Sequence, residues 1–134
     1  MKVFLGGTCS DSQWREELKP LLKIDYFDPV VDDWKDEAYR RELHERETAD
    51  YVLYVITPRM TGVYAIAEAV DDSNKRPAKT VFCARDMDGG LRFDKAQMKS
   101  LLAVCALIER NGGAVRCSLE GIARLVNGEE CREK

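Results

Sequence analysis

The sequence predicts an α/β protein built on a doubly wound parallel sheet of about five strands, with helices on both faces. Short apolar segments alternate with helix-like segments along the chain, the order that a parallel sheet with crossover helices requires. The segment YVLYVIT at 51–57 is apolar without polar alternation, which is typical of a central strand covered on both faces. A length of 134 residues, 45% of them apolar, fits a single domain over residues 1–134.

The first strand and the first helix are separated by glycine. Residues 2–6, KVFLG, form a short apolar segment that Gly6 and Gly7 stop. Ser10 and Gln13 follow with the spacing of a capping box, so we expect a helix to begin there. The segment therefore predicts a strand, a glycine turn and a helix.

The second strand and helix are separated by proline. Residues 24–30 form an extended segment in which Pro29 disfavours helical geometry at Asp28. The charged segment 32–49 is typical of a surface helix. Its centre, RRELHERE at 40–47, carries charges of both signs, and we expect a solvated face with i,i+4 ion pairs and no chemistry.

The rest of the chain continues the alternation of strands and helices. The expected elements are a turn and helix at 57–76, a strand at 79–84, a loop at 85–93, a helix at 94–113 that Gly112 and Gly113 end, a strand at 114–117 and an amphipathic helix at 118–126. The tail at 127–134 is expected to fray.

Charge and hydropathy exclude several classes of partner. A net charge of -3 provides no basic field for nucleic acid. No apolar segment approaches membrane-spanning length, and the opening MKVFLGGTCS is too short for the core of a signal peptide. We therefore expect a cytoplasmic protein that binds neither nucleic acid nor membranes.

The five cysteines form no C-x-x-C pair and have no metal-like spacing, which predicts reduced thiols and no metal site. Cys83 and Cys105 fall in apolar segments and are expected in the core. Cys9 follows the glycine turn, but the single histidine, His44, lies in the charged helix. A Cys/His catalytic pair and a cofactor are both unexpected.

Parallel sheets bind ligands outside the carboxyl ends of their strands. The loop after the first strand places Gly6, Gly7 and Thr8 before a helix, where backbone N–H groups can hold an anion or hydroxyls. Arg15 would add a cation for a phosphate or lie on the surface. The loop has neither a G-x-G-x-x-G pattern nor a P-loop lysine, and an ordinary tight turn is the alternative interpretation.

The loop after the second strand, YFDPVVDDW, offers Asp28 and Trp34 as ligand contacts. A tryptophan can stack on a heterocycle while a nearby carboxylate accepts hydrogen bonds from it. The alternative is structural, because Asp32 and Asp33 can cap the helix that follows and Asp28 precedes a proline.

The helix after Gly62 has two faces at 100° per residue. The apolar face expected to lie on the sheet consists of Val63, Ile66, Ala67 and Val70. The other face carries Thr61, Tyr64, Glu68 and Asp71. Glu68 is thus either a solvated charge or a catalytic carboxylate beside a hydroxyl and a phenol. The small Ala65 and Ala69 flank this face, so a helix of a second subunit could pack there.

Four segments together resemble the nucleoside 2-deoxyribosyltransferase-like family. They are VFLGGT at 3–8, YFDP at 26–29, ADYVLYVIT at 49–57 and TGVYAIAEAVDDSNKRPAKTVFC at 61–83. The resemblance covers residues 2–84, and beyond them only the order of elements agrees. It implies a flavodoxin-like fold and a homo-oligomer, dimer or larger, whose subunits complete one another's sites.

The resemblance also implies roles for individual residues. The family's catalytic glutamate attacks the anomeric carbon of a 2-deoxyribosyl group, and Glu68 is the matching acid. Asp50 matches an acid before the third strand that orients or protonates the departing base, and the glycine turn would lie beside the sugar. Two features depart from the family pattern: Glu68 stands six positions after Gly62, and Arg59 lies in a loop where many members carry an aspartate.

These observations lead to one main hypothesis and two alternatives. The main hypothesis is cleavage or exchange of the N-glycosidic bond of a 2-deoxynucleoside or its monophosphate, through a glutamyl-deoxyribose intermediate. Arg15 and Arg59 would suit a phosphorylated substrate. The first alternative is a nucleotide-binding or regulatory module that keeps the fold without the chemistry. The second is a glycosidase that cleaves NAD.

Overall fold

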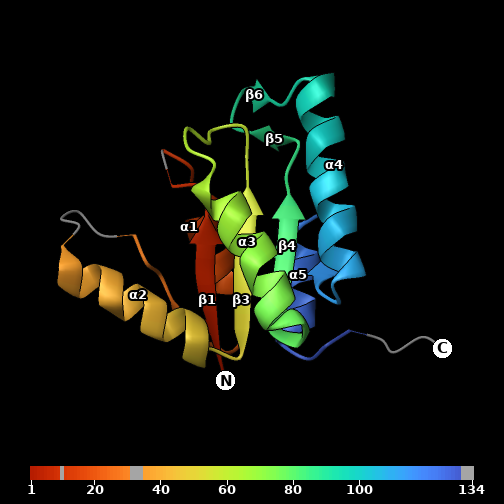
Figure 1. The fold of residues 1–134 in the computed structure, drawn as a ribbon. Coiled ribbons are helices and arrows are strands. Elements are labelled where there is room, and N and C mark those ends of the chain that lie inside the picture. The colour runs from red at the N-terminus through yellow and green to blue at the C-terminus, as the bar shows by residue number, and fades with distance from the viewer. Residues whose placement is uncertain (10, 31–34, 131–134) are drawn as a thin grey trace.

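The computed structural model describes residues 1–9, 11–30 and 35–130. In this part of the chain five strands form one sheet in the order β2-β1-β3-β4-β7, and all neighbouring pairs are parallel. Figure 1 shows the strands side by side with helices in front of and behind them. This arrangement confirms the predicted α/β class and the flavodoxin-like architecture.

The strands of the sheet are β1 (Lys2–Gly7), β2 (Asp25–Phe27), β3 (Tyr51–Ile56), β4 (Thr80–Ala84) and β7 (Ala114–Val115). The helices are α1 (Trp14–Leu18), α2 (Asp36–Thr48), α3 (Tyr64–Lys75), α4 (Lys95–Arg110) and α5 (Leu119–Val126), with single 3-10 turns at Lys19–Leu21 and Pro77–Lys79. Among the described residues, no helix is both long and apolar enough to cross a bilayer.

Two apolar layers cover the sheet, one on each face. The layer between the sheet and helices α1 and α5 contains Trp14, Leu53 and Ile122. The opposite layer, under α3 and α4, contains Tyr54, Ala69 and Ile108. β3 has a fully buried run because it contributes to both layers, as its lack of polar alternation predicts. Cys83 and Cys105 are buried in these layers, as predicted.

The prediction was accurate at α4 and α5 and less so at α1. Asp94 and Gln97 form a capping box at the start of α4, and Ser118 caps α5. α1 begins only at Trp14, because Asp11 has a positive φ of 53° that interrupts a helix beginning earlier. Of the predicted capping box at the start of α1, Ser10 lies outside the described residues.

The predicted loop at 85–93 contains a small antiparallel hairpin, β5 (Met87–Asp88) and β6 (Leu91–Arg92). The turn between them includes Gly89, whose φ of 64° suits the DGG sequence of a tight hairpin. In Figure 1 the hairpin rises beyond the carboxyl end of β4.

The face of α3 that lies on the sheet was predicted wrongly. Val63 and Ala67 are exposed, whereas Ala65 and Ala69 pack against the sheet with Ile66 and Val70. The small alanines let α3 approach closely over the bulky side chains of β3. The helix is therefore rotated from the expected orientation, and Glu68 moves from the solvent side toward the sheet, where it is only 12% exposed.

Candidate active site

The strand order creates a crevice at the carboxyl ends of β1 and β3. The chain leaves β1 toward β2 at the edge of the sheet and then returns to β3 on the other side of β1. Ligands of open α/β sheets bind where the strand order reverses in this way. The glycine turn after β1 and the loop that leads into α3 both lie at this crevice.

Glycine is required at both positions of the turn because it lies directly on β3. Gly7 has a φ of 120°, and a Cβ atom there would stand 2.1 Å from the Val55 carbonyl oxygen. A Cβ at Gly6 would stand 2.7 Å from the Tyr54 ring. Thr8 continues this contact, since its hydroxyl accepts a hydrogen bond from the Thr57 N–H at 3.0 Å.

Arg15 stabilises the conformation of the glycine turn through hydrogen bonds to the backbone. Its guanidinium donates to the carbonyl oxygens of Leu5, Gly7 and Thr8 at 3.0, 3.3 and 2.7 Å. The residue is 5% exposed. It is therefore neither a surface arginine nor directed at the cavities described below, and its donors serve the backbone of the turn.

Glu68 projects from the second turn of α3 between two cavities at the crevice. The first cavity, about 220 Å³, is shared with Phe4, Gly6, Gly7, Cys9, Pro29, Val30 and Glu42. The second, about 230 Å³, is shared with Gly7, Thr8, Cys9, Ile56, Met60, Thr61, Gly62, Tyr64 and Ala65. A ligand lying against the glycine turn would thus meet the Glu68 carboxyl from either side.

Glu42 brings a second carboxyl to the first cavity. It projects from α2 and, like Glu68, lines that cavity. Burial raises the pKa of Glu68 to about 7, Arg46 opposes the rise, and Glu42 adds to it. Burial also raises the pKa of Glu42. Two neighbouring carboxyls whose charges interact in this way titrate as a pair.

Arg46 joins Glu68 to a buried anion. Its Nε and Nη2 atoms lie 3.3 and 3.1 Å from the two oxygens of Asp72, and its Nη1 lies 3.2 Å from Glu68 Oε2. Asp72 is fully buried and also accepts hydrogen bonds from the Tyr54 hydroxyl, at 2.5 Å, and from Arg76. α2 and α3 are therefore tied together directly behind Glu68.

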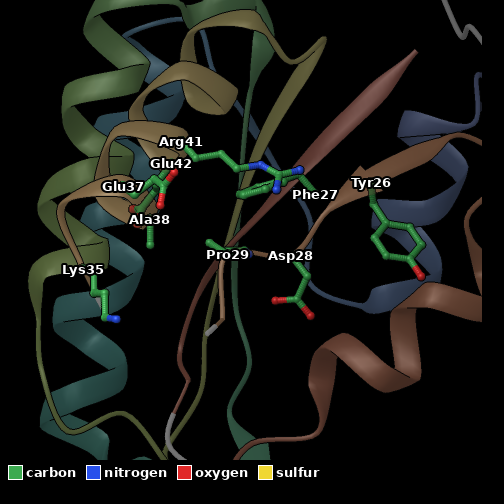
Figure 2. Close-up of a pocket in the computed structure, with 9 residues that line it drawn as sticks. All are labelled: Tyr26, Phe27, Asp28, Pro29, Lys35, Glu37, Ala38, Arg41 and Glu42. Atoms are coloured by element: carbon green, nitrogen blue, oxygen red, sulfur yellow. The ribbon is translucent and has the colours of Figure 1, made fainter. Parts of the chain in front are cut away.

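A larger cavity of about 540 Å³ adjoins the first one and shares Pro29 and Glu42 with it. Figure 2 shows this cavity between α2 and the end of β2, with Arg41 reaching across it toward Phe27. The Arg41 guanidinium lies 5.0 Å from the centre of the Phe27 ring. An aromatic wall beside a planar cation is suited to a flat heterocycle.

The predicted ligand contacts after β3 lie at the second cavity. Thr61, Gly62 and Tyr64 line it with Thr8, and Tyr64 is 69% exposed. They precede or begin α3, where backbone N–H groups have no partner within the helix and favour an anion or hydroxyl.

Two other predicted site residues, Arg59 and Asp28, are engaged elsewhere, and one lies outside the described residues. Arg59 pairs with Asp88 of the hairpin, with 3.6 Å between Nε and Oδ1, and does not line either Glu68 cavity. Asp28 pairs with Lys19 at 2.9 Å and accepts a hydrogen bond from the Val30 N–H at 3.0 Å, although it also borders the larger cavity. Trp34, with Asp32 and Asp33, lies outside the described residues.

Asp50 is not brought to Glu68 within one copy of the chain. It stands just before β3, and its carboxylate accepts a hydrogen bond from the Lys2 N–H at 2.8 Å, at the amino end of the sheet. Glu68 lies beyond the carboxyl end, and the six residues of β3 between them span roughly 20 Å. The order of residues along the chain did not reveal this separation.

Four members of the site were not predicted: Glu42, Arg46, Tyr54 and Asp72. The segment 40–47 was expected to be solvated, but Arg46 is only 8% exposed and Glu42 borders the cavities. Two signals were available. Glu42 and Arg46 share a face at i,i+4, as do Glu68 and Asp72. A tyrosine within an apolar central strand also needs a hydrogen-bond partner for its hydroxyl.

Comparison with known protein families matches the part of the chain that contains the candidate site. A family model described as nucleoside 2-deoxyribosyltransferase like matches residues 1–87, which include β1 to β4 and every residue of the site named above except Asp88. The comparison with curated proteins found no significant match.

Proposed function

The chain belongs to the nucleoside 2-deoxyribosyltransferase-like family, and from this premise we propose that it cleaves or exchanges the N-glycosidic bond of a 2-deoxynucleoside or its monophosphate. The observation that carries the proposal is the position of Glu68, a largely buried carboxyl between two cavities that both border Gly7. A carboxylate in that position can attack a sugar carbon held against the glycine turn.

In the first step a Glu68 carboxylate oxygen forms a bond to C1′ of the sugar while the bond from C1′ to the base nitrogen breaks. The electron pair of that bond stays with the base, which takes up a proton. In the second step water or an acceptor base attacks C1′, and the Glu68 carboxylate departs. Two displacements at the same carbon give net retention of configuration.

Glu42 is the group we propose as the proton donor for the departing base. It shares the first cavity with Glu68 and interacts with it electrostatically. Burial raises the pKa of Glu42, which favours its protonated form, and a protonated carboxyl can release its proton to a leaving group. In the second step the Glu42 carboxylate would take a proton from water. Glu42 replaces Asp50 in this role, because Asp50 lies at the other end of the sheet.

The cavities on either side of Glu68 suggest how the substrate lies. With Glu42 beside the base, the base would occupy the first cavity and extend toward Phe27 and Arg41. The 5′ end of the sugar would then lie in the second cavity, near Thr61 and Gly62. A 5′-phosphate would meet the amino end of α3 there.

The test is release of free base from a panel of 2-deoxynucleosides and their monophosphates, with and without an acceptor base. We expect release in the wild type and none in Glu68→Ala, which should still fold and unfold cooperatively. Glu47→Gln, an exposed glutamate on α2, is the matched control and should keep full activity. Undiminished base release by Glu68→Ala would refute the mechanism.

A nucleotide-binding module without chemistry is the second candidate. The observation in its favour is that Arg46 holds Glu68 in an ion pair at 3.2 Å, as a purely structural carboxylate would be held. In that case the same panel would raise the melting temperature of the protein without releasing base. Release of nicotinamide from NAD would instead indicate a glycosidase of another specificity.

A further inference from the structure

We propose that Arg46 is a positioning residue that keeps the Glu68 carboxyl ionised and oriented toward the crevice, with Asp72 and Tyr54 as its buried anchor. The inference rests on the proposed role of Glu68 as nucleophile. It adds a group that does not touch the substrate, on a helix whose charged face showed no chemistry in the sequence.

The geometry of Arg46 fixes its guanidinium in one orientation. Nε and Nη2 donate side-on to the two oxygens of Asp72, a bidentate arrangement that fixes the plane of the guanidinium. Nη1 is the remaining nitrogen, and it points to Glu68 Oε2 at 3.2 Å. The Arg46 side chain is 9% exposed, so little water competes for these contacts. The position of Glu68 thus follows from that of Asp72.

Asp72 is itself held from several sides. The Tyr54 hydroxyl donates to its Oδ2 at 2.5 Å, and Arg76 donates to its Oδ1. Gly6 contributes indirectly, because any side chain there would displace the Tyr54 ring. The glycine turn that receives the sugar and the anchor that orients the nucleophile therefore meet at one aromatic ring.

The charged and titratable groups around Glu68 act in opposite directions. Arg46, from α2, favours its ionised form. Glu42, from α2, and Asp72, from α3, disfavour that form. Cys9, from the turn after β1, and Tyr64, from the start of α3, border the same cavities. Arg46 is the only cation within ion-pair distance of Glu68 among the residues that the structure describes.

Removing Arg46 alone would leave the buried Asp72 without its bidentate partner and destabilise the protein. The variants are therefore Arg46→Met/Asp72→Asn, which removes the buried pair together, Asp72→Asn alone, and Arg46→Lys. The measurement is the titration midpoint of the Glu68 carboxyl by 13C NMR, with the resonance assigned by its absence in Glu68→Gln. Circular dichroism checks that each variant is folded.

We expect the double variant to raise the Glu68 midpoint by about one pH unit, because the lost attraction of Arg46 outweighs the repulsion of Asp72 that is lost with it. Base release at pH 7 should then fall about fivefold, and the ascending limb of its pH profile should move to higher pH by the same amount as the Glu68 midpoint. Asp72→Asn alone should leave the midpoint unchanged or lower it, because Arg46 remains and a repelling charge is gone. Arg46→Lys should restore most of the wild-type midpoint.

An unchanged Glu68 midpoint in the folded double variant would overturn the inference. A purely structural role would reduce activity by the same factor at every pH, and that result would overturn it as well. The NMR titration needs no substrate, so it tests Arg46 even if the wild type releases no base. Absence of base release would count against the proposed function alone.

Discussion

Replacing Glu68 with glutamine should make the protein more stable at neutral and alkaline pH while removing its activity. The pKa of Glu68 is raised from an ordinary value of 4.5 to about 7 by burial. Between these two values the folded protein keeps a proton that the unfolded chain has lost. Stability is therefore lost as the pH rises through this interval, which is the opposite of the behaviour of a carboxylate with a lowered pKa.

The size of the stability gain follows from the difference between the folded and unfolded pKa values of Glu68. The difference between these two pKa values corresponds to at most about 3 kcal/mol in the free energy of unfolding. Because Glu68 titrates together with Glu42, we expect Glu68→Gln to gain about 1–3 kcal/mol. Glutamine has nearly the same shape and stays neutral, so Glu68→Gln should avoid this cost. A nucleophile held in a site that disfavours its charged form is an instance of stability given up for activity.

The assay is urea denaturation of the wild type and Glu68→Gln at several values between pH 4 and pH 8.5. We expect the two free energies of unfolding to be similar near pH 4, with the variant gaining its advantage through pH 5 to 7. Glu47→Gln, an exposed change of the same chemistry, should show no such trend. A variant that is less stable than the wild type at pH 8 would refute the reasoning.

Two further predictions concern the sheet ends. Gly7→Ala should destabilise the protein by roughly 2–4 kcal/mol and abolish base release, because its Cβ would overlap the Val55 carbonyl and its φ is positive. Thermal and urea unfolding measure the loss of stability, and a variant of near-wild-type stability would contradict the close contact. Asp50→Asn should retain base release within a few-fold, because Asp50 is bound to the Lys2 N–H far from Glu68; a loss as large as that of Glu68→Ala would show that Asp50 takes part, for example in the site of another subunit.

The fold was predictable because its signals are local. Apolar runs, glycine stops and capping residues each act within a few positions, and they identified the five strands and the order of the helices. The hairpin at β5 and β6 was missed because two-residue strands are too short to show a period. Its DGG turn was the available signal.

The site was predictable only in part because burial is a property of the whole fold. The glycine turn was identified from its place after the first strand and the role of Glu68 through a family resemblance, and the two are adjacent in the structure. Arg46 and Glu42 lie in a segment whose composition indicates a solvated face, and only the packing of α2 against α3 buries them. The buried face of α3 was predicted wrongly because the alanines Ala65 and Ala69, which a helical wheel does not mark as strongly apolar, face the sheet.

The most direct test of the central claim is capture of the covalent intermediate on Glu68. In Glu42→Gln, a 2-deoxynucleoside whose base departs without protonation should complete the first step, while the second step is slow because the base that activates water is missing. Mass spectrometry of the quenched reaction should find a deoxyribosyl adduct on the peptide that contains Glu68. The same adduct should be absent from Glu42→Gln/Glu68→Gln. Base release without an adduct at Glu68, or an adduct on another residue, would contradict the account.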